Sequence, residues 1–132
     1  MEIVLVRHAQ PEWEPGGVAV DNPGLTELGH EQARHTAESL ASETFDVLYA
    51  SPLRRALETA EPIAKALGLE IRSQPWLREL GLASLEGCSS EQVQQYFADA
   101  HARQLEHWWD GLPGGESFRH FYERVTGGVE SL

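Results

Sequence analysis

The sequence has a single cysteine and no long apolar run, and both absences restrict what the protein can be. Among 132 residues, Cys88 is the only cysteine, so no disulfide can form within the chain and a reducing compartment is favoured. Cys88 lies in no metal-site pattern and is interpreted as an incidental thiol. No stretch approaches the roughly 20 apolar residues of a membrane span, and the amino terminus has no charged leader. We therefore expect a cytoplasmic protein that does not contact a membrane.

Positive charge is also scarce. The chain carries 10 Lys and Arg against 21 Asp and Glu, a net charge of −11, which argues against nucleic acid or an anionic membrane as partner. A basic pocket inside an acidic shell would suit a small anionic substrate, although a solvated acidic surface explains most of the charge equally well. Five arginines lie in the first two thirds of the chain, near the motifs described below: Arg7, Arg54, Arg55, Arg72 and Arg78.

The length predicts one domain spanning residues 1–132 with a substantial core. Short apolar runs at Ile3–Val6 and Val47–Ala50 predict two buried strands, and the alternation at Leu69–Arg72 predicts a third. Strands separated by helices indicate an α/β fold, a three-layer α/β/α sandwich with a mostly parallel sheet.

Helix signals fill the intervals between these strands. Thr26 is the expected amino-terminal cap of a helix ending near residue 42, and Ser51-Pro52 is the expected start of a second helix. Gly68 should end that second helix, and Pro62 should kink it because the hydrogen bond to the carbonyl four residues earlier is lost.

Two more helices are predicted in the second half. Ser89 and Gln92 have the spacing of a capping box for a polar helix that reaches about Trp108, beside Trp109, and both indoles are interpreted as packing residues. A last amphipathic helix follows Phe118 and is weakened by Gly127-Gly128.

The pair Arg7-His8 directly follows the first predicted strand, and Gln10-Pro11 then turns the chain. In open α/β folds, ligands bind at the carboxyl ends of the strands. Arginine offers a planar fork for phosphate oxygens, and histidine offers a ring nitrogen that is largely unprotonated near neutral pH. The adjacent pair is therefore suited to phosphoryl transfer through a phosphohistidine.

Four more segments follow the RHAQ segment (Arg7–Gln10) along the chain. They are Leu25–Ala33 (LTELGHEQA), Ser51–Ala60 (SPLRRALETA), Leu77–Gly81 with Leu85–Gly87, and Gly114–Ser117. Taken in chain order, the first four segments resemble four motifs of the histidine phosphatase superfamily: RHG, LTxxGxxQA, SPLxRAxxTA and LxE…G…EG. The fifth resembles a later segment of the same superfamily. This superfamily is also called phosphoglycerate mutase-like, and the resemblance covers nearly the whole chain.

The resemblance implies roles for individual residues. His8 would be the nucleophile that accepts the phosphoryl group, Arg7 and Arg55 would bind the phosphate, and Glu79 would give a proton to the leaving alcohol. Fixed cations suit this task because they stabilise the negative charge on the transferring group. Gln10 is a further candidate for contact with substrate. The resemblance implies no cofactor and no metal.

Arg54 and Arg55 cannot both face one site, because successive helical residues point about 100° apart. We choose Arg55, the position that matches the family motif, and expect Arg54 on or near the surface. The histidine pairs His30/His35 and His101/His107 have spacings that do not suit a metal pair on one helical face.

The chain departs from the family pattern in two places. Ala9 stands where glycine is usual, which is a mild change. The family's second catalytic histidine, in a segment resembling SHGG, does not occur before Leu132, and no other histidine here has that context. By the resemblance, a central strand of the sheet is missing with it, which exposes the edges of two inner strands. We interpret the chain as C-terminally incomplete; a homodimer or a domain-swapped sheet is the alternative.

The predicted function is that of a phosphomonoesterase acting on a small phosphorylated metabolite through a phosphohistidine on His8. A phosphoglycerate-mutase-type phosphotransferase is less favoured, because residues 12–22 lack the N…FTGW pattern typical of mutases. If the second histidine is truly absent, a non-catalytic module that binds a phospho-ligand or a protein is the competing class.

Overall fold

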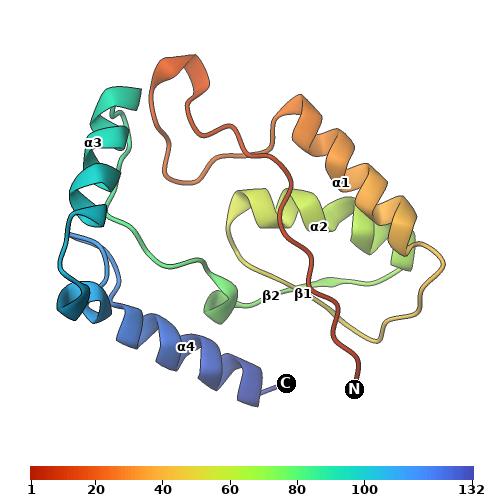
Figure 1. Ribbon diagram of the computed structural model, residues 1–132. Helices are drawn as coiled ribbons and strands as arrows, with labels where there is room; N and C mark the ends of the chain where they lie inside the picture. The colour runs from red at the N-terminus through yellow and green to blue at the C-terminus, as the bar shows by residue number, and fades with distance from the viewer. The chain divides into compact units, whose positions relative to one another are not determined.

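A computed structural model describes residues 1–132, with the exception of the side chain of Leu105. The chain forms two compact units, each built from two stretches of sequence. Unit 1 comprises residues 1–12 and 22–75, and unit 2 comprises residues 13–21 and 76–132. Figure 1 shows the elements of both units in chain order.

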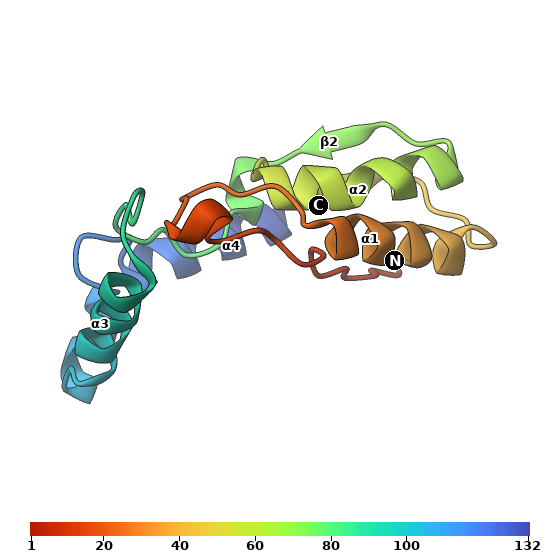
Figure 2. The ribbon, with the colours of Figure 1, turned by 90° about the horizontal axis from the view of Figure 1, so that it is seen from above.

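Unit 1 holds two helices and a parallel pair of strands. The helices are α1 (Glu27–Leu40) and α2 (Arg54–Leu67), and the strands are β1 (Leu48–Ala50) and β2 (Ile71–Ser73). Leu48 pairs with Ile71 in parallel register. Helix α2 contacts α1 and both strands, and Figure 2 shows it between α1 and β2. The α/β class with parallel pairing is therefore confirmed.

The core of unit 1 is made of small side chains where the helices meet. Ala33 and Ala37 are buried on α1, and Ala60 and Ile63 are buried on α2. Small residues at this interface let the two helices approach closely. Ala33 also forms a buried cluster with Ala9, the residue after His8. The core thereby reaches the segment that carries the proposed nucleophile.

The strand predicted at Ile3–Val6 is wrong for this structure. These residues form no strand, and their side chains are exposed, with Leu5 reaching 90%. Figure 1 draws them as an irregular trace at the amino terminus. A strand forms only where a neighbour supplies hydrogen-bond partners, and no strand in the described chain pairs with this run.

Local capping signals set the helix ends. The Thr26 hydroxyl accepts a hydrogen bond from the Gly29 backbone at 2.9 Å, which confirms it as the cap of α1. Gly68 ends α2 in the left-handed conformation, with φ of 67°. The start predicted for α2 at Ser51-Pro52 is wrong by two residues: Ser51 accepts from Leu53, and the helix begins at Arg54. Helix α2 continues through Pro62.

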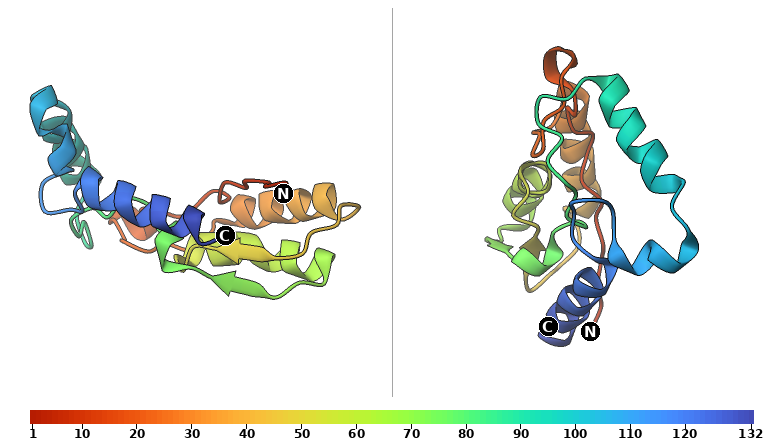
Figure 3. Two further views of the ribbon diagram at one scale, coloured as in Figure 1. Left: turned by 90° about the horizontal axis from the view of Figure 1, so that it is seen from below. Right: turned by 90° about the vertical axis from the view of Figure 1, so that its left-hand side faces the viewer.

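Unit 2 contains two helices, α3 (Ser90–His101) and α4 (Phe118–Glu130). It also contains the short 3₁₀ turns η1 (Pro15–Gly17), η2 (Pro75–Leu77) and η3 (Leu105–Asp110). The first residue of η2 is the last residue of unit 1. Figure 3 shows α3, η3 and α4 as separate helical segments joined by short loops. The Ser89–Gln92 capping box is present, with both reciprocal hydrogen bonds. The helix it begins ends at His101, earlier than predicted, and Trp108 lies in η3.

A loop from the amino-terminal half completes unit 2. Ala19 donates to the Cys88 carbonyl at 2.8 Å and accepts from Gly87 at 2.9 Å. Asp21 accepts from the Leu85 backbone at 2.8 Å and from the Ser84 hydroxyl at 2.5 Å. These bonds hold residues 18–21 alongside residues 84–89. In the described chain, no helix is both long enough and apolar enough to span a membrane.

Candidate active site

His8 is half-buried, and a contact with the next residue favours one tautomer of its neutral ring. Nδ1 lies 2.8 Å from the Ala9 carbonyl oxygen. A carbonyl oxygen can only accept a hydrogen bond, so Nδ1 carries the proton of the neutral ring. The lone pair is then on Nε2. This tautomer suits His8 for nucleophilic attack through Nε2.

Arg55 is connected to the His8 segment through one hydroxyl group. Ala9 donates its backbone N–H to Thr59 Oγ1 at 3.0 Å, and Thr59 Oγ1 donates to the Arg55 carbonyl at 2.7 Å. Arg55 and Thr59 are each 4% exposed. Residues four apart share one face of a helix. The face of α2 that carries Arg55 therefore packs toward the residue that follows His8.

Arg54 occupies a different face of α2, as predicted. Its side chain is 64% exposed and donates from Nε to Glu58 Oε1 at 2.6 Å. Burial raises the pKa of Glu58, but hydrogen bonds from the Leu25 backbone and from Arg54, together with the charges of Arg54 and His30, bring it below its usual value. Arg54 thus stabilises an ion pair at the surface, while Arg55 is buried.

Gln10 anchors the start of α1. Its side-chain oxygen accepts from the Thr26 hydroxyl at 2.8 Å, and its carbonyl accepts from the Thr26 backbone at 3.0 Å. Its own backbone N–H donates to Gln32 at 3.0 Å. A Cβ atom at Gly29 would overlap the Gln10 carbonyl, so glycine permits this close approach.

The remaining predicted residues are solvent-exposed. Arg7 precedes His8 in the extended amino-terminal segment of unit 1, and its side chain is exposed. Glu79 is also exposed and belongs to unit 2. Within unit 1, hydrogen bonds connect the segment of His8 to the helix of Arg55 through Thr59, whereas those of Gln10 connect it to α1 and its cap. The catalytic roles of these four residues, His8, Arg7, Arg55 and Glu79, stay predictions, as does the substrate contact of Gln10.

Sequence reasoning missed Thr59 as a contributor. The residue stands inside the SPLRRALETA segment, but its hydroxyl was given no role. A threonine four residues after Arg55 on an apolar helix face needs hydrogen-bond partners when buried, and that requirement is the signal that could have found it.

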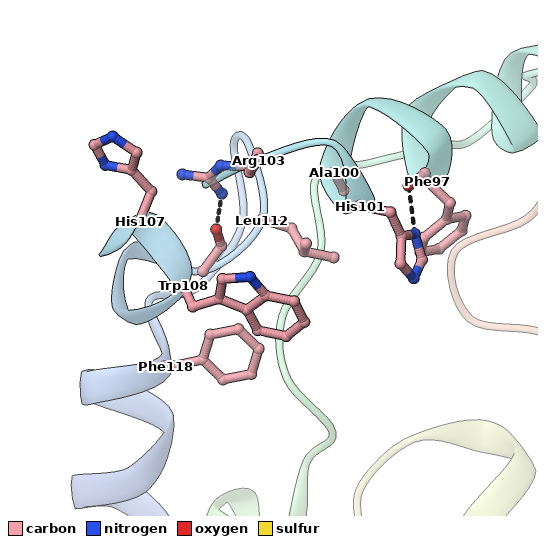
Figure 4. Close-up of a pocket in the computed structure, with 9 residues that line it drawn as sticks. Phe97, Ala100, His101, Arg103, His107, Trp108, Leu112 and Phe118 are labelled. Carbon is pink, nitrogen blue, oxygen red and sulfur yellow. Dashed lines mark hydrogen bonds between the residues drawn. The ribbon is translucent and has the colours of Figure 1, made fainter. Parts of the chain in front are cut away.

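Unit 2 has an apolar pocket of about 230 Å³ between α3, η3 and the start of α4 (Figure 4). Phe97, Leu112, Trp108 and Phe118 line it, and the last two rings stack with centroids 6.2 Å apart. Trp108 remains 49% exposed, so it packs only in part. The lining is mostly apolar, which does not fit a phosphate group.

Among the described side chains, no group of three or more His, Cys, Asp or Glu could hold a metal ion.

Within unit 1, the hydroxyl of Thr59 thus connects the segment that carries His8 to the helix that carries the buried Arg55. The chain belongs to the histidine phosphatase superfamily (branch 1), whose sequence profile matches residues 3–132. It is 35% identical over 136 residues to phosphoserine phosphatase 1 of Hydrogenobacter thermophilus, covering 100% of this chain and 64% of the relative. It is also 34% identical over 131 residues to a 2,3-bisphosphoglycerate-dependent phosphoglycerate mutase of Parvibaculum lavamentivorans, covering 93% and 62%.

Solved structures agree with this assignment. A mycobacterial glucosyl-3-phosphoglycerate phosphatase superposes with a TM-score of 0.74 at 31% identity, covering 95% of this chain and 60% of its own. The α-ribazole phosphatase of Shigella flexneri gives 0.75 at 25% identity, covering 95% and 63%. The predicted fold class is therefore confirmed. The chain spans a little under two thirds of the length of these relatives.

Proposed function

We propose that the protein is a phosphomonoesterase in which His8 takes the phosphoryl group from a small phosphorylated metabolite. The observation that carries this proposal is the 2.8 Å contact between His8 Nδ1 and the Ala9 carbonyl, because it directs the lone pair to Nε2. Arg55 is buried, and its helix is hydrogen-bonded through Thr59 to the residue after His8, which supports its role as a fixed cation for the phosphate.

The reaction takes place in two steps. Nε2 of His8 attacks phosphorus, a nitrogen–phosphorus bond forms, and the bond to the alcohol oxygen breaks with its electron pair on that oxygen. Glu79, as the carboxylic acid, gives its proton to the departing oxygen. Arg7 and Arg55 bind the phosphoryl oxygens in the transition state. Water then attacks phosphorus and gives a proton to the Glu79 carboxylate, which restores the carboxylic acid. The nitrogen–phosphorus bond breaks with its electron pair on Nε2, inorganic phosphate leaves, and Nδ1 of His8 keeps its proton throughout.

The direct test is chemical trapping with the full chain. After rapid quenching with a ³²P-labelled phosphoester, the protein should carry label that is acid-labile and base-stable. His8→Ala should carry none. The matched control is His35→Ala, because His35 is a surface histidine on α1 whose side chain is 79% exposed. Label retained by His8→Ala, or lost equally in His35→Ala, contradicts the proposal.

A mutase-type phosphotransferase is a second candidate, favoured by the phosphoglycerate mutase among the relatives. The two activities differ in the acceptor for the second step, which is water for a phosphatase and another hydroxyl of the substrate for a mutase. Measuring inorganic phosphate against isomerised product, from the same labelled phosphoglycerate, separates them. We favour the phosphatase because residues 12–22 lack the mutase pattern.

A non-catalytic phospho-ligand module is the third candidate. Binding of inorganic phosphate without turnover of p-nitrophenyl phosphate would support it.

We further propose a cytoplasmic location, since the single cysteine needs no oxidising compartment, and a homodimer, since the apolar run Ile3–Val6 is exposed. Sedimentation velocity tests the dimer.

A further inference from the structure

One guanidinium in unit 2 binds the backbone around the proposed proton donor. Arg124, on α4, donates from Nη1 to the Trp76 carbonyl at 2.8 Å and to the Arg78 carbonyl at 3.0 Å. Its Nη2 lies 3.5 Å from the Glu79 carbonyl. Three carbonyl oxygens from four consecutive residues thus converge on one side chain more than 40 positions later in the sequence.

Glu116 holds the other side of the same segment. Its Oε2 accepts from the Gly81 backbone at 3.1 Å, and its own backbone N–H donates to the Gly81 carbonyl at 2.7 Å. It also binds Arg124 in a two-pronged pair, with Nε to Oε1 at 3.0 Å and Nη2 to Oε2 at 2.7 Å. Together the two side chains hold the backbone on both sides of Glu79.

The pair is well suited to fixing a backbone. The side chains of Arg124 and Glu116 are only 18% and 14% exposed, so their hydrogen bonds compete little with water. The Arg124 hydrogen bond is the main cause that lowers the pKa of Glu116 to about 2, so this carboxylate stays ionised at neutral pH. His120 adds a contact to Oε1 at 2.7 Å.

We propose that Arg124 and Glu116 are positioning residues that fix residues 76–81 and thereby aim the side chain of Glu79. The inference rests on the proposed function, because it acts through the proton that Glu79 gives to the leaving alcohol. Neither residue needs to touch the substrate. Misplacing a catalytic group by about 1 Å can cost on the order of 100-fold in rate.

The leaving group provides the test, since an alkoxide needs a proton and p-nitrophenolate does not. We expect Arg124→Lys, which keeps the charge but loses the fork, to lower kcat on propyl phosphate about 10- to 100-fold. Its kcat on p-nitrophenyl phosphate should change by less than about threefold. Glu116→Gln should act in the same direction. Arg119→Lys and Glu123→Gln, both exposed on α4, are the matched controls and should change neither rate.

Glu79→Gln separates failure of this inference from failure of the proposed function. It should show the same dependence on leaving group, and adding Arg124→Lys to it should cost little more. If Glu79→Gln shows the dependence and Arg124→Lys lowers both rates equally, the positioning role alone is wrong. If the unaltered protein turns over neither ester, or Glu79→Gln shows no dependence, the proposed function falls and the positioning role falls with it.

Hydrogen exchange gives a readout that does not depend on turnover. Glu116→Gln should speed exchange of the Gly81 amide, which donates to Glu116 Oε2, while the amides of α4 keep their protection. Unchanged exchange at Gly81 contradicts the inference. Equal loss of protection throughout α4 also contradicts it, because the pair would then merely stabilise the helix.

Discussion

The backbone N–H of Ala9 donates to the Thr59 hydroxyl at 3.0 Å, and this bond connects the segment carrying His8 to the helix carrying Arg55. Both Ala9 and Thr59 are buried, so water cannot replace either partner easily. The geometry of the proposed phosphate site therefore depends on a group that takes no part in the chemistry.

Thr59→Val tests this connection. The substitution keeps the shape of the side chain but leaves the Ala9 N–H unsatisfied, so we expect the free energy of unfolding to fall by about 1–3 kcal/mol. Urea unfolding measures it, and kcat on p-nitrophenyl phosphate should fall as well. Thr36→Val is the control, since Thr36 makes the same bond to the carbonyl four residues earlier, on α1. Equal losses in the two variants would contradict the prediction.

Arg55→Lys and Arg54→Lys should differ sharply. Arg55 is buried and matches the family's phosphate-binding position, whereas Arg54 is paired at the surface with Glu58. We expect Arg55→Lys to lower kcat/KM about 100-fold or more, and Arg54→Lys to lower it less than about threefold. Titration with inorganic phosphate checks the same contrast without turnover. Similar effects of both substitutions would place the phosphate elsewhere.

The Glu116–Arg124 pair predicts how stability depends on pH. The pKa of Glu116 is lowered to about 2 in the folded protein from 4.5 as its ordinary value. Its contribution is thus fully present above pH 4.5 and is lost as pH falls toward 2; it amounts to on the order of 1–3 kcal/mol. In urea unfolding across this range, the stability difference between the unaltered protein and Glu116→Gln should shrink as pH falls. A constant difference would show that the charge is not responsible.

Adjacent glycines on α4 should respond in opposite ways to alanine. A Cβ at Gly127 meets nothing within 4 Å, so Gly127→Ala should stabilise the helix by about 1 kcal/mol. A Cβ at Gly128 would overlap the indole of Trp76, so Gly128→Ala should destabilise by about 1–3 kcal/mol. Thermal unfolding of the two variants gives shifts of opposite sign; a shift of the same sign for both would refute the close contact.

Features set by neighbouring residues were predictable from the sequence. The Thr26 cap, the Ser89–Gln92 capping box and the Gly68 terminus each depend on hydrogen bonds or backbone angles within a few residues. The 100° step of a helix predicted that Arg54 and Arg55 would lie on different faces, and the family motif selected Arg55 for the site. The part of the candidate site that lies on α2, Arg55, could therefore be predicted from the sequence.

Features that depend on distant partners were not predictable. The run Ile3–Val6 has the composition of a buried strand, but pairing requires a neighbour that no local pattern supplies. Arg124 binds carbonyls 45 to 48 positions earlier, and any residue type can offer a carbonyl. The sequence of the partner segment therefore does not indicate that its backbone carbonyls bind Arg124.

The alternation of the chain between the two units has a practical consequence for dissecting the protein. A cut after Pro75 does not separate them, because residues 13–21 would remain with the wrong fragment. The carboxyl-terminal piece would lose the partners of Leu85 and Cys88, which lie on Asp21 and Ala19. Fragment complementation would therefore require the amino-terminal piece to bring that loop back, so expressing either half alone cannot isolate its unit intact.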